Sequence, residues 1–278
     1  MAIAFDAYST GSTTGTSLTV SHTTSGSNRI LIVGVQTGTG GSSLVTGITY
    51  NGTAMTNIDS SIGNGVQRWL ETWYLIAPTS GTHDIVVSTS GSVFIQVVAT
   101  SYTGALQSGQ PDAHGTKASV SGSSFSHAIT TVHGECWLVG FLENDGGTIV
   151  AGASTTLRSA LGGLALADSN GTVAVGSVSL AYTGANADWN SLELSIQPTE
   201  ISISVSDTVT MTETTNVFFK FVFTILDSIT MSDTATAIKN VWNNITKNTV
   251  SITNETKHTV TATNETKHSS TFTNETKS

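Results

Sequence analysis

A five-residue motif, Thr-Asn-Glu-Thr-Lys, recurs at an interval of ten residues near the end of this chain. Its three copies begin at Thr253, Thr263 and Thr273. Strand side chains alternate between two faces, so an even interval places the same side chains of every copy on the same face. One face is then wholly polar and the other mildly apolar. The pattern predicts a long extended strand that needs a neighbouring sheet.

A weaker form of the same pattern lies upstream. Residues 207–214 and 227–234 match position for position at an interval of twenty, and the odd positions of 217–225 between them are all apolar. That segment predicts a strand with one fully apolar face. We expect the apolar side chains of the repetitive region to contact neighbouring subunits. They are Val217, Phe219, Phe221, Phe223, Ile225, Val250, Ile252, Val260 and Phe272.

The segment Gln197-Pro-Thr-Glu200 marks the predicted boundary between two parts of the chain. Glycine is common before it and absent after it. We therefore expect a β-sandwich domain over residues 1–198. Residues 199–278 are expected to form a Thr-rich tail of extended strands that pair between subunits.

The first part is expected to be all-β, because short apolar or alternating runs are separated by glycine-rich turns. The apolar run 29–35 predicts a central strand, and 45–50 leads into the hairpin turn Asn51-Gly52. A second hairpin turn is expected at Asn170-Gly171. Only 155–167 has a helical period, and its glycines argue against a helix. Further strands are predicted at 67–77, 84–88, 93–102, 124–131, 135–142, 172–182 and 191–196. The series suggests a sandwich of jelly-roll type.

Three segments carry a resemblance to known proteins. They are Gly47-Ile-Thr-Tyr-Asn-Gly-Thr-Ala-Met55, Trp73-Tyr-Leu-Ile-Ala-Pro-Thr-Ser-Gly-Thr-His83 and Ala99-Thr-Ser-Tyr-Thr-Gly-Ala105. Together they resemble a β-sandwich domain of environmental bacterial and phage surface or appendage proteins. The resemblance covers roughly residues 1–198 and concerns turn and core positions, so it implies a fold and no chemistry. The tail is similar in pattern to the donor strands of pilus-like subunits.

The composition narrows the class of partner. Ser and Thr make up roughly a third of the 278 residues, whereas charged residues make up 10%, well below the usual quarter. The net charge is −9 and no run of Lys or Arg occurs, which argues against a nucleic-acid-binding surface. No stretch approaches the ~18 apolar residues of a membrane helix, so we expect no membrane span.

An extracellular location is expected, although the first residues lack the basic start and apolar run of a secretory signal. Three routes remain open at this point. The chain is exported without a standard leader, it leaves the cell by lysis, or a leader has been removed from the numbering.

The usual catalytic and cofactor-binding motifs are missing from the sequence. No histidine shares metal-ligand spacing with another histidine, cysteine or carboxylate. We therefore expect no catalytic residues, no metal and no cofactor. The single cysteine, Cys136, lies in an apolar run and is expected to be a buried, inert thiol. The acidic loop Glu143-Asn-Asp-Gly-Gly147 is read as a polar turn rather than a calcium site.

Two features of the sequence concern glycans. The repeated motif makes Asn254, Asn264 and Asn274 candidate glycosylation sites, although they fall on the less polar face. The tryptophans at positions 69, 73, 137 and 189 fit either a sugar-stacking platform or a sandwich core. Both alternatives stay open at the level of sequence.

These observations favour a structural subunit of an extracellular filament. Copies of the chain would join head to tail, each donating C-terminal β-strands to its neighbours. The alternative is a phage or cell-surface adhesin or fibre protein with a carbohydrate-binding sandwich that recognises surface glycans. A third hypothesis, a glycan hydrolase, lacks a nominated pair of carboxylates.

Overall fold

The computed structural model describes residues 2–38, 43–62 and 68–199, together with three short strands at 230–232, 250–254 and 258–262. The chain divides into two compact units, residues 1–205 and 206–278, and each is treated by itself below. Every regular element of the described residues is a β-strand, as the all-β prediction requires.

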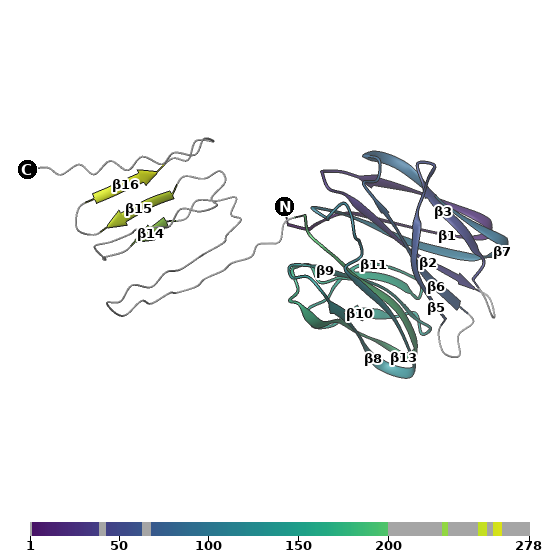
Figure 1. Cartoon of the computed structure of the whole chain (residues 1–278). Helices are drawn as coiled ribbons and strands as arrows, with labels where there is room; N and C mark the ends of the chain where they lie inside the picture. Colours follow the sequence, from purple (N-terminus) through teal and green to yellow (C-terminus); the bar gives the residue numbers. More distant parts are fainter. Residues whose placement is uncertain are drawn as a thin grey trace, which may run out of the picture. The chain divides into compact units, whose positions relative to one another are not determined.

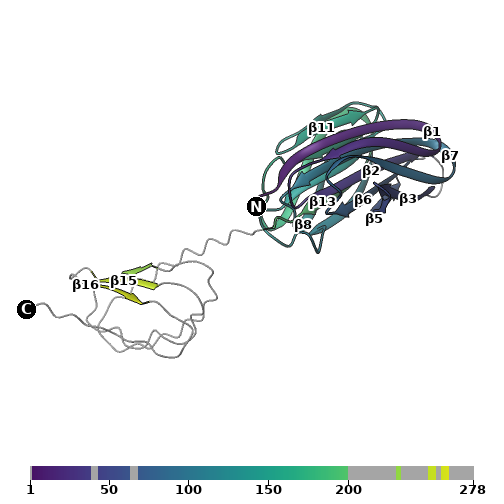
Figure 2. The same ribbon diagram turned by 90° about the horizontal axis from the view of Figure 1, so that it is seen from above.

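The first sheet is built from the first seven strands. They are β1 (Ala4–Thr24), β2 (Ile30–Gly38), β3 (Val45–Tyr50), β4 (Thr53–Ala54), β5 (Thr56–Ile62), β6 (Arg68–Ile76) and β7 (Gly81–Thr103). Their hydrogen-bonded order is β4-β3-β7-β2-β6-β5, and β1 also pairs with β7. β1 follows one edge of β7 along the whole length of that strand. In Figure 2, β1 and β7 run side by side along one border of the unit. The opposite edge of β7 pairs with β3 in its first half and with β2 in its second half.

The second sheet is built from the next six strands. They are β8 (Ala113–Thr131), β9 (Trp137–Asn144), β10 (Ile149–Ala151), β11 (Thr156–Leu161), β12 (Leu164–Asp168) and β13 (Gly176–Ile196). Their order is β10-β13-β9-β12-β11, with β8 paired to β13. The strands of both sheets pair antiparallel, and β13 changes partner from β10 to β9 along its length.

The two sheets repeat one topology. Strands β8, β9, β10, β11, β12 and β13 take the places of β1, β2, β3, β5, β6 and β7, and only β4 has no counterpart. Over the first two strands, equivalent residues lie 107 positions apart. The backbone N–H groups of Ser25 and Val132 each donate to an aspartate carboxylate at 2.9 Å. Asn28 and Glu135 both have a positive φ, of 52° and 60°. Residues 1–199 are therefore an internal structural repeat, which the sequence analysis did not find.

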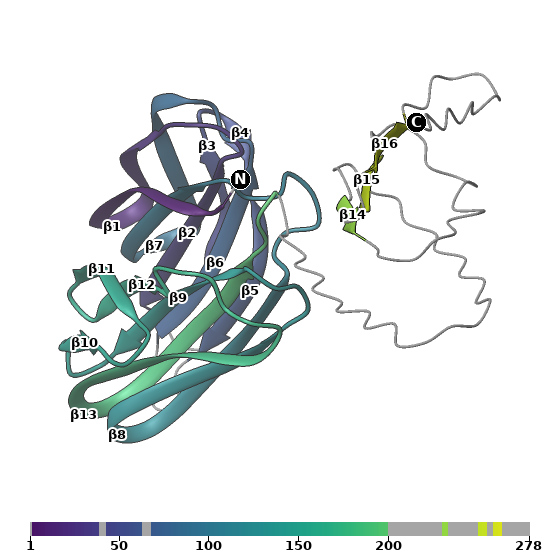
Figure 3. The ribbon, with the colours of Figure 1, turned by 90° about the vertical axis from the view of Figure 1, so that its left-hand side faces the viewer.

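The two sheets face each other within this unit, as Figures 1 and 3 show. A central core joins Ile30 and Ile32 of the first sheet to Val139 and Phe141 of the second. Each sheet also curls around a second core of its own. The core of the first sheet contains Val33. The core of the second sheet contains most of the large apolar side chains of β8 and β13. The sandwich prediction is confirmed, with each sheet formed by one half of residues 1–199 rather than by strands that alternate between sheets.

The central strands β2 and β9 are covered on both faces. All but the last residue of β2 and all residues of β9 are buried. A strand covered on both sides reads as a continuous apolar run instead of alternating. This is why the run 29–35 correctly predicted a central strand.

Turn chemistry gave one correct and one wrong prediction. Tyr50 pairs with Thr53 across Asn51-Gly52, and both loop residues have positive φ, of 48° and 74°, as a type I′ hairpin requires. The hairpin expected at Asn170-Gly171 does not form, because β12 and β13 lie on opposite sides of β9. The chain there crosses over β9 instead of reversing onto a neighbour.

Long strands were predicted as separate pieces or missed. The runs 84–88 and 93–102 are parts of β7, and 172–182 and 191–196 lie largely within β13. In each case the ladder to the partner strand shifts register at the predicted gap, between Gly15 and Ser17 on β1 and between Thr183 and Ala187 on β13. The segment 155–167 is the β11–β12 hairpin, and no helix forms there.

The second unit contains a three-stranded sheet among its described residues, in the order β14-β15-β16. Strand β14 (Thr230–Ser232) pairs parallel with β15 (Val250–Asn254), which pairs antiparallel with β16 (His258–Ala262). Strands thus form in the tail, but β15 and β16 pair antiparallel with each other, Asn254 with His258, instead of continuing as one strand.

Gly34 offers a test of the central core. A Cβ at this position of β2 would overlap the ring of Phe141 on the opposite sheet. We expect Gly34→Ala to lower the free energy of unfolding by about 1–3 kcal/mol, as overpacking of a core does. Gly47→Ala is the matched control, because a Cβ there meets no atom within 4 Å. Equal urea midpoints for both variants would contradict the packing described here.

Candidate functional site

The carboxylate of Asp6 lies at the centre of a hydrogen-bond network in the first sheet. It accepts from the Ser101 hydroxyl at 2.7 Å and from the backbone and hydroxyl of Ser25. The ring nitrogens of His22 bond to Ser9 at 2.9 Å and to Ser101 at 3.1 Å. Burial lowers the pKa of His22 to about 4, so the ring is neutral near pH 7, although Asp6 opposes the shift.

This network does not have the order of a catalytic triad. Ser101 stands between His22 and Asp6, whereas the histidine of a triad lies between its acid and its nucleophile. His22 is also only 2% exposed, which leaves the base out of reach of a substrate. The arrangement instead ties the start of β1 to β7 and to the turn after β1.

The second sheet has the equivalent network around Asp112. Its carboxylate accepts from the Ser195 hydroxyl at 3.2 Å and from the backbone of Val132 at 2.9 Å. His133 contacts the same carboxylate through its ring. Cys136 is completely buried and donates to the carbonyl of His133 at 3.3 Å. Burial, followed by the nearby Asp112 charge, raises the pKa of the thiol to about 12. Its geometry supports the sequence interpretation of an inert thiol.

A polar layer crosses the central core at one end. Gln36 of β2 donates to Glu143 of β9 at 3.0 Å, and Arg68 of β6 approaches the same carboxylate oxygen at 3.2 Å. Asn190 lies directly opposite Glu143 in the ladder between β13 and β9. Gln36 and Glu143 occupy equivalent positions in the two sheets, 107 residues apart. The repeat therefore places these two side chains against each other.

Glu143 is a buried acid with an unusual proton affinity. Burial raises its pKa to about 7, against the opposing effect of Arg68, and Asp145 adds to the rise. Arg68 does not cancel the effect of burial because its side chain is 37% exposed, so water screens its charge. Within the described residues, Gln36 Oε1 and Glu143 Oε2 have no hydrogen-bond partner. When Glu143 is protonated, its O–H group supplies the hydrogen-bond donor that these two oxygens otherwise lack.

A second polar contact between the sheets lies around Asp168. Its carboxylate accepts from the Tyr102 hydroxyl at 2.9 Å and from Arg158 at 2.7 Å. The Arg158 guanidinium lies over the Phe5 ring, 4.3 Å from the centroid. Tyr102 and Phe5 belong to the first sheet, and the charged pair belongs to the second. The carboxylate and the guanidinium therefore neutralise each other at the interface and hold the sheets in register.

The four tryptophans of the sandwich do not form one platform. Trp137 and Trp189 are buried, at 8% and 1% exposure. Trp69 and Trp73 are half-buried on one face of β6 with Glu71 between them. Trp73 donates to Glu71 at 3.2 Å, and burial raises the pKa of that carboxyl despite hydrogen bonds from Ser43 and Trp73. Of these four tryptophans, only Trp69 and Trp73 are partly exposed.

The acidic loop predicted as a polar turn begins inside a strand. Glu143 belongs to β9 and its side chain is part of the polar layer. Gly147 has a φ of 79°, which suits a turn. No group of three or more potential metal ligands gathers among the residues that the structure describes.

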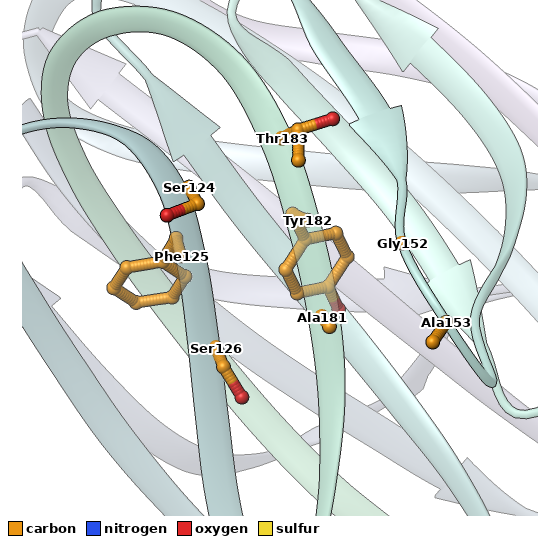
Figure 4. A pocket seen from close by; sticks show the side chains of 8 residues that line it. All are labelled: Ser124, Phe125, Ser126, Gly152, Ala153, Ala181, Tyr182 and Thr183. Carbon is orange, nitrogen blue, oxygen red and sulfur yellow. The ribbon is translucent and has the colours of Figure 1, made fainter.

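A shallow depression of about 320 Å³ lies over β8, β13 and the segment after β10. Figure 4 shows the Tyr182 and Phe125 rings beside the hydroxyls of Ser124, Ser126 and Thr183. Phe125 stacks on Trp189 with centroids 5.5 Å apart. No carboxylate, histidine, lysine, arginine or cysteine lines the depression.

Two long edge strands border the sandwich, β1 of 21 residues and β8 of 19. Each pairs with a neighbour on one side only among the described strands. Figure 3 shows them on opposite sides of the unit. Both alternate between buried and exposed side chains in the halves that end at Thr24 and Thr131. An edge strand presents unpaired N–H and C=O groups to any added strand.

The predicted subunit contacts fall partly within the described tail. Val250 and Ile252 lie on β15 opposite Ala262 and Val260 of β16, and Asn254 ends β15. The remaining predicted contacts and glycosylation sites lie outside the described residues. They are Val217, Phe219, Phe221, Phe223, Ile225, Phe272, Asn264 and Asn274.

Comparisons with protein-family models, curated proteins and solved structures yield no match. Among the described residues, no helix is long and apolar enough to cross a membrane.

Protonation of Glu143 predicts a pH-dependent stability. Its pKa is raised in the folded state, so its contribution is complete below about 4.5 and is lost as the pH rises through 7. Burial likewise raises the pKa of Glu193, to about 9, which extends the decline. We expect Glu143→Gln to flatten the fall in stability between pH 5 and 8 by at most about 3 kcal/mol.

Urea unfolding at pH 5, 6.5 and 8 measures this effect. Asp84→Asn is the control, because Asp84 is exposed on β7 and its replacement should leave the pH profile unchanged. A Glu143→Gln profile parallel to that of the unmodified protein would count against a protonated Glu143.

Proposed function

We propose that this chain is a structural subunit of an extracellular filament, assembled as copies of itself through β-strand addition. The sandwich is the body of each subunit, and strands from the repetitive region pair with a neighbouring body. Such a contact joins different surfaces of the two copies, so it extends into an open polymer unless the rotation closes a ring.

This proposal is supported by the presence of two complementary parts in one chain. The sandwich contains all its core residues between Ile3 and Ile196 and leaves β1 and β8 as long edges. Residues 206–278 form a separate unit whose described parts are short Thr-rich strands. One part accepts strands and the other supplies them.

The charge distribution supports association between a body and a tail. Residues 1–199 carry four basic and eleven acidic side chains, whereas residues 200–278 carry six lysines and eight acids. Two bodies therefore repel each other more strongly than a body and a tail do. The more balanced tail lowers the electrostatic cost of contact.

Carbohydrate binding is the second candidate function, and one observation favours it. Trp69 and Trp73 are half-buried on one face of β6 and flank Glu71. Sugars stack on aromatic faces, so these two partly exposed rings are the tryptophans of the sandwich that a surface glycan can contact, although Glu71 itself is only 4% exposed. Binding of residues 1–199 to a glycan array, lost in Trp73→Ala, would favour an adhesin over a filament subunit.

Removal of the tail tests the filament. Because all three cores lie within residues 1–199, we expect this fragment to be a folded monomer, while the full chain forms long filaments. Negative-stain microscopy and sedimentation distinguish the two. Filaments of the fragment alone would contradict the proposal.

A substitution series refines the same test. Replacing Phe219, Phe221 and Phe223 by serine removes the predicted apolar strand face and should reduce polymer at least tenfold. The control changes Lys220 and Thr224, on the other predicted face, to serine and should assemble normally.

A further inference from the structure

We infer that β1 is the edge that receives the donated strand, and that the donor is the tail of a second copy of this chain. This inference rests on the filament proposed above and names its acceptor surface. β1 extends over 21 residues, which at about 3.3 Å per residue is roughly 70 Å of backbone. Its ladder with β7 is unshifted from Ala7 to Gly15 and again from Ser17 to Thr24. Either stretch is long enough to pair with a five-residue strand such as β16, which among the described strands has a neighbour on one side only.

β1 lacks the features that normally protect a sheet edge. Natural edges are short, covered, or carry charges and prolines. Between Ala4 and Thr24 there is no lysine, arginine, glutamate or proline. The carboxylate of Asp6 is engaged by Ser25 and Ser101, and His22 is buried and neutral. The exposed side chains from the middle of the strand onward are small hydroxyls. They belong to Ser12, Thr14, Thr16, Ser17, Thr19, Ser21 and Thr23.

The other edges of the sandwich are better protected. β8 carries Lys117, whose ammonium lies 5.2 Å from the Phe125 centroid, and its ladder with β13 shifts twice between Ser119 and Ser124. β5 and β11 have only seven and six residues and carry Asp59 and Arg158 respectively. Among the described edges, β1 alone is both long and free of lysine and arginine.

The composition of the tail strands matches this edge. β15 reads Val-Ser-Ile-Thr-Asn and β16 reads His-Thr-Val-Thr-Ala, with neither lysine nor carboxylate in either. Opposite the hydroxyl row of β1, their threonines form Thr–Thr and Thr–Ser pairs, which stabilise antiparallel strands. No like charges meet across the new ladder. A second sandwich is the poorer partner, because its body carries the larger excess of acidic groups.

Disulfide trapping between two different chains tests the assignment. One protein carries Ser21→Cys on β1 and the other carries Thr261→Cys on β16, each in the full chain and only one of them tagged. The natural Cys136 can remain, because it is buried and its thiol pKa is about 12. Separate chains exclude a bond within one molecule. Opposed residues of paired strands lie within the Cα separation that a disulfide spans.

The internal repeat supplies a matched control. Ala128 of β8 is the counterpart of Ser21, 107 positions on, and both are exposed. We expect the disulfide-linked heterodimer of Ser21→Cys with Thr261→Cys to form at least tenfold more than that of Ala128→Cys with Thr261→Cys. Because the pairing register is free, Thr19→Cys and Thr23→Cys are tested beside Ser21→Cys. All three sites are exposed, so unchanged thermal midpoints confirm that each variant folds.

The outcomes separate the inference from the filament itself. Preferential links to Ala128→Cys, or none to β1 in preparations that still form filaments, would overturn β1 as acceptor and leave the filament standing. Homodimers through Ser21→Cys alone would mean that β1 pairs with its own copy, which also overturns the inference. If the unmodified chain forms no filaments, the proposed function fails and the inference fails with it.

Discussion

Burial of both faces of β2 and β9 is the constraint on which the rest of the sandwich depends. A strand covered on both sides must supply apolar side chains in both directions and must find two cores. The central core lies between the sheets, and each sheet provides the other core by curling over its own central strand. The long strands β7 and β13 make that curl possible, because each changes partner part-way along its length. The two cores behind the sheets therefore need no additional layer.

The sequence predicted the features that local chemistry determines. Asn51-Gly52 specifies its hairpin whatever surrounds it, and the apolar run 29–35 indicates a strand with both faces covered. Features determined by distant contacts were missed. The residues of β1 are mostly Ser, Thr and Gly, with little apolar signal of their own, and they become a strand because β7 pairs with them over their whole length. Asn170-Gly171 has the chemistry of a hairpin turn, but the order of the strands makes it a crossover.

The same distinction applies to the candidate sites. Cys136 lies in an apolar run, so its inertness followed from its neighbours in sequence. The meeting of Gln36 with Glu143 could not be predicted without recognising the repeat, because the interval of 107 residues is visible in the strand order and hardly in the residues. Positive φ at Asn28 and Glu135, held by unlike residues, shows how the backbone keeps a symmetry that the side chains have lost. The tail motif, in contrast, repeats letter for letter, yet β15, which contains the start of its first copy, pairs antiparallel with β16 where one long strand was expected.

The internal repeat affects which residues meet where the two sheets contact each other. Gly34 faces Phe141 and Gln36 faces Glu143, although each pair holds one place in two copies of the same fold. Were the halves identical molecules, every residue at such a place would meet itself. Two phenylalanines would collide, two glutamates would repel, and two glycines would leave a void. Covalent fusion frees the halves from self-complementarity, so a large ring can sit against an empty position and an acid against an amide.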